Sequence, residues 1–201
     1  MRLRGLYAIT PECSDSAALL EKVEQALRGG VALLQYRSKS RNRNLLAEAT
    51  ELARLAQRHG VPMIVNDDVE LALEVNAGGV HLGRDDGDVA AARARLPGRL
   101  VGASCYDQLA LAQQAAAAGA DYVAFGSVFP SSTKPGAVRA PLSLFGAAAG
   151  LGLPLCAIGG ITAENAAEVV RSGADLLAVI TDLFDAPDIA GRARQYAKAF
   201  S

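Results

Sequence analysis

The chain has 201 residues, of which 51% are hydrophobic and 20% charged, and its formal net charge is −1. This length and composition predict a single domain over residues 1–201 with one sizeable core. The near-neutral charge gives no reason to expect nucleic acid or a membrane surface as a partner, so any anion site must be built locally.

The cysteines Cys13, Cys105 and Cys156 are odd in number, lie far apart and lack the spacing of a zinc site. We expect buried, reduced thiols and therefore a cytoplasmic location. The N-terminal residues do not read as a secretory signal, and no run of about 20 apolar residues could span a bilayer. The oligomeric state stays open, a homo-oligomer included.

Short β-branched runs alternate with alanine- and leucine-rich segments along the whole chain. The runs predict strands, which we place at 5–10, 31–36, 62–66, 79–82, 100–104, 121–126, 154–159 and 175–180. The segments between them have apolar residues at helical spacing and predict helices near 16–28, 44–59, 68–76, 87–95, 107–118, 141–149, 162–171 and 187–199.

The predicted strands are apolar on both faces, which is typical of a parallel sheet covered by helices. Glycine recurs before several strands, in "GGVALLQ", "AGGVHLG", "AGADYVAFG" and "SGADLLAVI", where it would end the preceding helix in the left-handed conformation. Eight such units favour an α/β fold, a single (β/α)₈ TIM barrel. The alternative is an open doubly wound sheet, but no Gly-x-Gly-x-x-Gly opens the first helix.

A barrel of this kind carries its chemistry at the carboxyl ends of its strands, and polar residues gather there. After the second strand, Gln35, Arg37 and Lys39 alternate along an extended segment and would share one face. An arginine fork with a lysine suits phosphate oxygens, although both could be solvated loop charges.

The third and fourth strands are followed by "NDD" and "GRDD". Asp67 and Asp86 would then meet at one mouth, where two carboxylates beside a phosphate suit Mg²⁺. Asp68 and Asp85 are instead candidates for helix caps, and a cap is also open for Asp67.

The later strands supply hydroxyls and backbone. Ser104 and Tyr106 follow the fifth strand, and "PSSTKPGA" follows the sixth. Gly159 and Gly160 follow the seventh and would open directly onto a helix N-terminus, a common phosphate pocket of such barrels. We therefore expect two anion sites, one cationic and metal-assisted for a diphosphate, one of backbone and hydroxyl groups for a monophosphate, with Lys134 between them.

Neither histidine carries a catalytic pattern. His59 would end a helix, and His81, inside the fourth strand, is expected to be a core residue. The sequence shows no pattern of a Ser-His or Cys-His pair, so we do not expect the reaction to need a strong general base.

In order and spacing, "QYRSK", "NDD", "GVHLGRDD", "GASCY", "FGSVFPSSTKPGA" and "AIGGIT" resemble the signatures of the thiamine phosphate synthase family over nearly the whole chain. That resemblance implies a transferase that condenses 4-amino-2-methyl-5-hydroxymethylpyrimidine diphosphate with thiazole phosphate, giving thiamine phosphate and pyrophosphate. It implies Mg²⁺ on Asp67 and Asp86. The reaction would begin with dissociative loss of the diphosphate, with no protein nucleophile.

The resemblance also implies site residues. Those expected to hold the pyrimidine diphosphate are Gln35, Tyr36, Arg37, Ser38, Lys39, Asn66, Ser104 and Lys134. Those expected to hold the thiazole phosphate are Ser131, Ser132, Thr133, Gly160, Ile180 and Thr181. The catalytic set would be Arg37, Lys39, Ser104 and Lys134. Ser131, Arg84 and Thr181 depart from the residues common in the family.

Three other functions compete with this interpretation. The related thiazole tautomerase branch shares the fold, but it uses a histidine shortly after the sixth strand, where this chain has Ser127. A non-catalytic phosphate sensor would need no metal beside a leaving group. A sugar-phosphate isomerase would need a clear acid/base pair.

Overall fold

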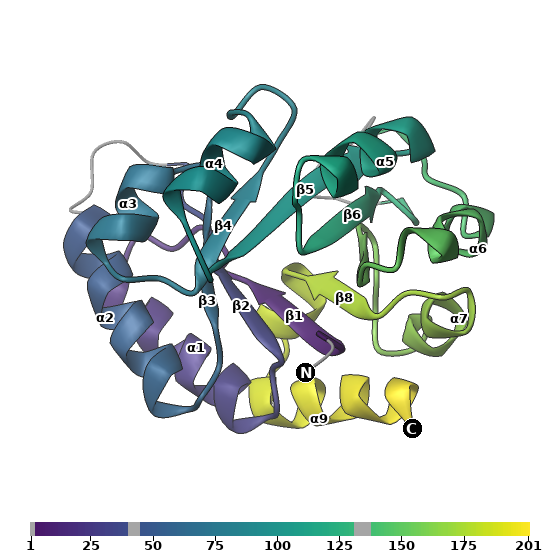
Figure 1. The fold of residues 1–201 in the computed structure, drawn as a ribbon. Coiled ribbons are helices and arrows are strands. Elements are labelled where there is room, and N and C mark those ends of the chain that lie inside the picture. The colour runs from purple at the N-terminus through teal and green to yellow at the C-terminus, as the bar shows by residue number, and fades with distance from the viewer. Residues whose placement is uncertain (1–2, 40–44, 131–137) are drawn as a thin grey trace.

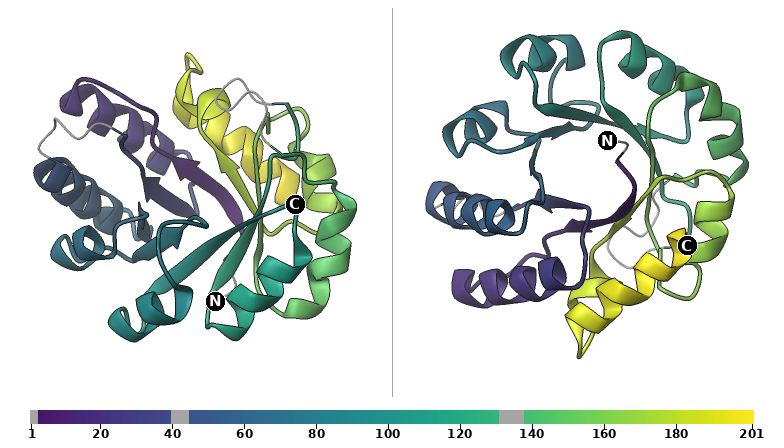
Figure 2. Two further views of the ribbon diagram at one scale, coloured as in Figure 1. Left: turned by 90° about the horizontal axis from the view of Figure 1, so that it is seen from above. Right: turned by 60° about the horizontal axis from the view of Figure 1, so that its bottom comes forward.

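A computed structural model describes residues 3–39, 45–130 and 138–201. Within these residues, eight parallel strands form a closed barrel in chain order, which confirms the predicted TIM barrel. The strands are β1 (Gly5–Ile9), β2 (Leu33–Tyr36), β3 (Met63–Asn66), β4 (Gly79–Leu82), β5 (Leu100–Tyr106), β6 (Tyr122–Gly126), β7 (Leu155–Ile158) and β8 (Leu176–Val179). Figure 2 shows the helices arranged as an outer ring around them.

The helices lie close to their predicted positions. They are α1 (Ser16–Arg28), α2 (Leu45–Arg58), α3 (Val69–Glu74), α4 (Val89–Arg95), α5 (Leu109–Ala117), α6 (Ser143–Ala148), α7 (Ala166–Arg171), α8 (Thr181–Phe184) and α9 (Ile189–Ala197). Short 3₁₀ turns follow α6 and α9, at Ala149–Leu151 and Lys198–Phe200. The four-residue α8 was not predicted.

Side-chain alternation along the strands builds two separate cores. Outward residues, such as Leu34 and Val65, pack with the helices in one large cluster. Inward residues form a second cluster inside the barrel: Tyr7, Ile9, Leu33, Ile64, Tyr122, Ala124, Cys156, Leu176 and Ala178. The strands are therefore buried on both faces, as a parallel sheet covered by helices requires.

The barrel closes between its first and last strands. Gly5 pairs with Leu176 and Ala8 with Val179, so β1 and β8 join in parallel register. The last long helix, α9, packs on α1 and on β1 and so covers this seam. Figure 1 shows α9 in yellow along the bottom of the molecule, with both chain ends beside it.

The recurrent Gly-Ala-Asp before β6 and β8 has a structural role at the amino ends of the strands. The carboxylate of Asp121 accepts the backbone N–H of Val101 at 2.7 Å, and that of Asp175 accepts the N–H of Leu155 at 3.1 Å. Each aspartate thus satisfies a donor that opens the neighbouring strand. The aspartates at this end stabilise the sheet, which leaves the other rim for chemistry.

The left-handed glycine predicted at helix ends is confirmed before β2, β6 and β8, but not before β4. Gly30, Gly119 and Gly173 have φ of 98°, 92° and 112°, whereas Asn76, with φ of 51°, takes that role after α3. The glycine at the start of β4 is needed for space instead. A Cβ on Gly79 would lie 1.9 Å from the carbonyl oxygen of Leu100.

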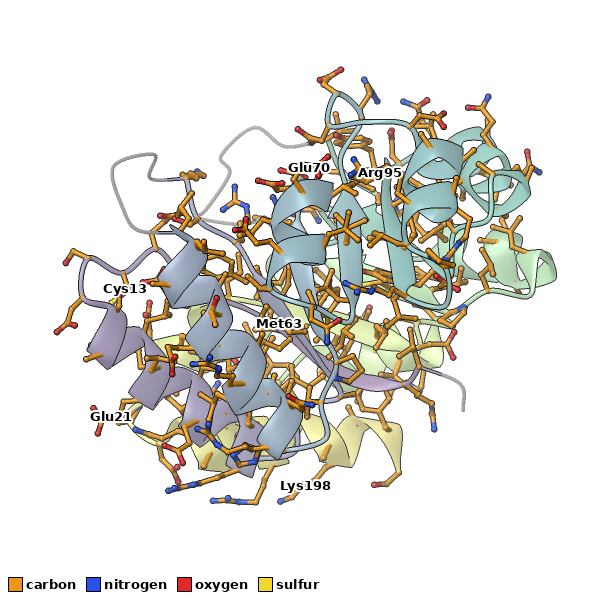
Figure 3. The ribbon with its side chains drawn as sticks, turned by 60° about the vertical axis from the view of Figure 1, so that its left-hand side comes forward. Cys13, Glu21, Met63, Glu70, Arg95 and Lys198 are labelled. Atoms are coloured by element: carbon orange, nitrogen blue, oxygen red, sulfur yellow. The ribbon has the colours of Figure 1, made fainter. Side chains whose placement is uncertain are left out.

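The outer surface carries ordinary helix-to-helix contacts. Figure 3 labels Glu70 on α3 and Arg95 on α4, which form an exposed ion pair outside the barrel. Such a pair contributes little to stability. Among the described residues, no helix is long and apolar enough to cross a membrane.

Candidate active site

A cavity of about 720 Å³ lies at the carboxyl ends of the strands. Its lining comes from all around the ring: Tyr7, Ile9, Gln35, Arg37, Asn66, His81, Ser104, Tyr106, Ala124, Gly126, Ser127, Pro130, Val138, Cys156, Ile158, Gly159, Gly160, Ile161, Thr162, Ala178, Val179, Ile180, Thr181 and Asp182. The glycine turn after β7 therefore shares one space with some of the polar side chains that the sequence places after β2–β5: Gln35, Arg37, Asn66, Ser104 and Tyr106. Asp67 and Asp86 are not part of this described lining.

Gln35 and Arg37 line the β2 side of this cavity. The backbone of Arg37 is held by Thr10 after β1, whose hydroxyl accepts the Arg37 N–H at 2.9 Å and donates to its carbonyl at 3.1 Å. The loop that carries the guanidinium is thus tied to the neighbouring strand.

The remaining residues predicted on this loop lie elsewhere. Tyr36 faces the helices, where its hydroxyl donates to Glu48 at 2.9 Å. Lys39 is exposed and its backbone N–H donates to Glu12, while Ser38 has a buried hydroxyl oxygen without a partner in the described residues. None of the three is among the described residues that line the cavity.

Asp67 and Asp86 do come together, beside Asn66, which lines the cavity. Partial burial and then the nearby Asp86 carboxylate raise the pKa of Asp67, while the Asn66 amide that donates to it acts in the opposite direction. Both carboxylates converge on Gly83, where a Cβ would lie 2.3 Å from an oxygen of Asp86 and 4.0 Å from one of Asp67.

This pair fits a hard cation. Two carboxylates held close together are stabilised by a positive charge between them, and Mg²⁺ takes one or two protein carboxylates. In the part of the chain that the structure describes, no three or more His, Cys, Asp or Glu residues are grouped so that they could hold a metal ion. A cation here would need its other ligands from elsewhere, such as substrate phosphate and water.

Of the aspartates predicted to cap helices, one is confirmed and one is not. Asp68 caps α3 as expected, accepting the N–H of Leu71 at 2.9 Å. Asp85 does not cap α4; Asp88 does, because the loop after β4 extends three residues further before the helix begins. Asp67 is not a cap, since it precedes the capping residue and points to Asp86.

No Ser-His pair was predicted, yet the structure contains one. His81 is buried on the inner face of β4, and its Nε2 lies 2.9 Å from the Ser104 hydroxyl on β5. Its Nδ1 contacts the hydroxyl of Tyr122 at 3.0 Å. Burial lowers the pKa of His81 to about 4, so the ring is neutral near pH 7.

Arg84, at a position where this chain departs from the common family residue, lies over a cavity wall. Its guanidinium carbon lies 4.6 Å from the centre of the Tyr106 ring. Tyr106 itself has a φ of 54°, an uncommon backbone conformation that turns its ring from the end of β5 to the cavity.

The turn after β7 lies closely against the segment after β6. A Cβ on Gly159 would lie 2.1 Å from the Ser127 hydroxyl, and one on Gly160 would lie 2.3 Å from the carbonyl oxygen of Pro130. Only glycine allows this approach. However, α7 begins at Ala166, so the expectation that the turn opens directly onto a helix is wrong.

Asn165 accounts for the delayed start of α7. Its side chain accepts the N–H of Thr162 at 2.9 Å and donates to the carbonyl of Gly160 at 3.0 Å, which holds the turn outside the helix. Within the described residues, the N–H groups of Gly160 and Ile161 have no hydrogen-bond partner. Backbone donors are thus available at the cavity wall.

After β8, Ile180 and Thr181 line the cavity at the start of α8. Asp182 anchors this corner: it accepts two hydrogen bonds from Arg192 at 2.8 and 2.9 Å and one from Tyr196 at 2.6 Å. It also accepts the N–H of Ala163 at 3.3 Å, so it connects the β7 and β8 loops.

The residues Ser131, Ser132, Thr133 and Lys134 lie outside the described residues, so their predicted roles stay predictions. Two functional residues, Tyr7 and Tyr122, were not predicted. Both are buried on the inner face, where Tyr7 lines the cavity and Tyr122 packs beside it. Strand alternation could have found them. Tyr7 pairs with Leu33, two residues before Gln35, and Tyr122 pairs with Gly102, two residues before Ser104, so each shares a face with an inward polar residue.

Comparison with known proteins gives a consistent result. A family model described as "Thiamine monophosphate synthase" matches residues 6–183. The chain is 58% identical to the thiamine-phosphate synthase of Aromatoleum aromaticum, over 99% of this chain and 97% of that one. It is 57% identical to the thiamine-phosphate synthase of an Azoarcus species, over 100% and 98% of the two chains.

A solved structure agrees with the sequence relatives. The thiamine phosphate pyrophosphorylase of Pyrococcus furiosus superposes with a TM-score of 0.87 at 33% identity, over 98% of this chain and 96% of that one.

Proposed function

The chain belongs to the thiamine monophosphate synthase family, the transferases that make thiamine phosphate, and from this premise we propose how its cavity carries out the transfer. The observation that supports the proposal is the meeting, in one cavity, of a charged and polar wall from β2–β5 with a glycine-rich wall from β6–β8. The first wall suits a diphosphate and the second a monophosphate.

On the first wall, Gln35, Arg37, Asn66 and Ser104 hold 4-amino-2-methyl-5-hydroxymethylpyrimidine diphosphate. A guanidinium can bind two phosphate oxygens at once, and Thr10 holds the Arg37 loop in place. We assign the diphosphate also to Lys39, Lys134 and the loop residue Ser38, on the family resemblance alone. Tyr36, predicted with them, would contribute through its backbone, because its side chain faces the helices.

Asp67 and Asp86 would hold Mg²⁺, for which their paired carboxylates are suited. The bound ion would supply positive charge to the departing diphosphate. Asn66 keeps the Asp67 carboxylate oriented through its side-chain amide.

On the second wall, the Gly160 backbone, Ile180 and Thr181 hold the phosphate of the thiazole, together with Ser131, Ser132 and Thr133. The support is the pair of backbone N–H groups at Gly160 and Ile161, which have no partner within the described ranges, and the anchoring of the neighbouring loop by Asp182. Backbone donors of this kind bind phosphate without a net protein charge.

The transfer then follows from positioning and electrostatics. The C–O bond between the pyrimidine methylene and the diphosphate breaks, and its electron pair leaves with the diphosphate, whose charge Arg37, Lys39 and Lys134 stabilise. The lone pair of the thiazole nitrogen forms the new C–N bond. The two walls hold both reactants together and keep water from the cation.

The pair of His81 and Ser104 does not supply a nucleophile in this scheme. A catalytic histidine base is usually held by a carboxylate that stabilises its positive form, whereas His81 faces the neutral hydroxyl of Tyr122. Its lowered pKa of about 4 makes it a weak base.

The thiazole tautomerase activity is the nearest alternative function, and the environment of Ser127 is evidence against it. The Ser127 hydroxyl is buried and donates to the carbonyl of Phe129 at 2.5 Å, so it supports the loop. A hydroxyl used in this way cannot shuttle protons on a thiazole.

The two functions are separated by one assay. We expect that both substrates with Mg²⁺ give thiamine phosphate and pyrophosphate in equal amounts, followed by mass spectrometry and a pyrophosphate-coupled assay, and that a chelator stops both. An isomerised thiazole without pyrophosphate would show the tautomerase instead. Product formation at the same rate under chelation would contradict the metal role.

A further inference from the structure

A continuous line of hydrogen bonds crosses the floor of the cavity. Gln35 Nε2 donates to the Tyr7 hydroxyl at 2.6 Å, and Tyr7 contacts the Tyr122 hydroxyl at 2.8 Å. Tyr122 contacts Nδ1 of His81 at 3.0 Å, and Nε2 of His81 contacts the Ser104 hydroxyl at 2.9 Å. This line, which we name the floor network, joins Gln35 and Ser104, two of the residues assigned above to the pyrimidine diphosphate.

The floor network is packed rigidly. Tyr7 and Tyr122 are 1% and 0% exposed, and their rings meet edge to face with centres 5.8 Å apart. The His81 ring stacks on Tyr122 at 5.5 Å. Gly102 makes room for this ring, because a Cβ there would lie 2.1 Å from the Tyr122 Cζ. The hydroxyls therefore have few alternative positions.

The partners fix the direction of every hydrogen bond. Tyr7 receives a hydrogen from Gln35, and Tyr122 is its only other hydrogen-bond partner among the described residues, so we direct its single hydrogen to Tyr122. Tyr122 then passes its hydrogen to Nδ1 of His81. A neutral histidine with an acceptor Nδ1 carries its hydrogen on Nε2, which donates to Ser104.

The direction of the network sets what its two ends offer to a ligand. The Ser104 oxygen already accepts from His81, which leaves its hydrogen free to donate into the cavity. At the other end, Gln35 has used an amide hydrogen, and its Oε1 has no partner among the described residues. The two ends of the floor network thus present one acceptor, at Gln35, and one donor, at Ser104, to the cavity.

We propose that Tyr7, Tyr122 and His81 are positioning residues that fix this acceptor–donor pattern and thereby select a 4-aminopyrimidine over a 4-oxopyrimidine. An aminopyrimidine donates from its amino group and accepts on its ring nitrogens, which matches an acceptor at Gln35 and a donor at Ser104. An oxopyrimidine offers the reverse order. The substrate part of this inference rests on the proposed function.

The network also predicts that both ends switch together. If the Gln35 amide turned over, every hydrogen along the line would have to reverse, because each hydroxyl has only one. Ser104 would then donate to His81, and Gln35 would present its NH₂ to the ligand. That reversed state matches an oxopyrimidine and places the histidine hydrogen on Nδ1.

The first test measures the tautomer of His81 without any substrate. Two-bond proton–nitrogen NMR spectra of the full chain at neutral pH should show neutral His81 with its hydrogen on Nε2. The chain has 2 histidines, so His59→Gln assigns the signals. A hydrogen on Nδ1, or an average of both tautomers, would overturn the proposal.

Tyr122→Phe breaks the network in the middle and keeps the ring. The described lining of the cavity does not include Tyr122, so the variant removes no direct contact there. We expect averaged His81 tautomers, and a loss of about tenfold in the ratio of kcat/KM for the aminopyrimidine over the oxopyrimidine diphosphate. The KM for thiazole phosphate should not change.

Tyr196→Phe is the matched control, because it also removes one buried tyrosine hydroxyl, which bonds to Ile161 and Asp182 outside the network. The His81 tautomer should be unchanged in it. If Tyr122→Phe does not fold, Tyr7→Phe breaks the same line one step earlier and should give the same averaged tautomer.

A double-mutant cycle tests whether the effect passes through Ser104. The selectivity loss of the double variant Tyr122→Phe with Ser104→Ala should be smaller than the sum of the two single losses, because both changes act on the same line, whose Gln35 end remains. Additive losses would contradict the proposal. If the unaltered chain made no thiamine phosphate, the proposed function would fail, but the tautomer result would still stand by itself.

Discussion

Asp67 and Asp86 show how one residue pair can be unfavourable alone and useful with a ligand. Their carboxylates converge beside Gly83, and both burial and mutual repulsion raise the pKa of Asp67. The pair therefore favours whichever cation or proton neutralises it.

The variant Asp86→Asn should separate the repulsion between the carboxylates in the metal-free protein from their contribution to the Mg²⁺-dependent reaction. It removes the repulsion, so the metal-free protein should melt at the same temperature or higher. The Mg²⁺-dependent rate should fall about 100-fold or more, since a charge that acts on the leaving group is lost. Glu70→Gln, an exposed carboxylate on the neighbouring α3, is the control for both measurements. A destabilised fold with a normal rate would show that Asp86 is structural.

His81 makes the stability depend on pH. Its pKa is about 4 in the folded chain and about 6.5 when unfolded, so the unfolded chain binds the additional proton between these values. Stability should be complete above about pH 6.5 and fall toward pH 4, by about 2 kcal/mol at pH 5. Urea unfolding of the unaltered chain and of His81→Gln, each above about pH 6.5 and at about pH 5, checks this. An equal loss in both proteins would assign the pH dependence to other groups.

At the scale of elements, α8 and α9 support the cavity from behind. Asp182 in α8 accepts from Arg192 and Tyr196 in α9 and from the backbone of Ala163 after β7. One side chain therefore sets the separation of the β7 and β8 loops, which form the proposed monophosphate wall.

Asp182→Asn should affect one substrate only. We expect a loss of about 1–3 kcal/mol in unfolding free energy, because buried donors lose a charged acceptor. The KM for thiazole phosphate should rise several-fold, while that for the pyrimidine diphosphate stays constant. Steady-state kinetics with each substrate varied in turn checks this, with Arg194→Ala on the exposed face of α9 as the control. Equal changes in both KM values would contradict a local role.

Most elements could be predicted because their signals are local. The helix at Ser16–Arg28 has the predicted bounds, since Asp15 caps its start and Arg28 precedes Gly29 and Gly30. The helix α8, "TDLF", escaped prediction because four residues cannot show a helical period. The late start of α7 was missed because the Asn165 side chain bonds to the backbone of Gly160 and Thr162 just before it, which apolar spacing does not show.

The site was predictable only in part for a similar reason. Gln35, Arg37, Asn66 and Ser104 follow strands and could be placed on the cavity from chain order. The pairing of His81 with Ser104 depends on the register between β4 and β5, in which His81 lies opposite Gly102. Register is set by packing in the closed barrel, which no single run of sequence shows.

For the whole molecule, closure of the barrel makes stability a property of the entire chain. β1 depends on β8, and α9 covers the seam between them. We infer that residues 1–201 form one domain that unfolds in one step. Far-ultraviolet circular dichroism and tyrosine fluorescence should give coincident denaturant transitions. Two separated transitions would divide the chain into independent parts.

Gly102 and Tyr122 fill one volume between them, since the phenol ring occupies the place where any side chain at position 102 would begin. Mutational libraries that vary either position alone will therefore mostly sample clashes or voids. The two positions need to be randomised jointly, with a gain in bulk at one compensated by a loss at the other, if the ligand preference of this barrel is to be re-engineered.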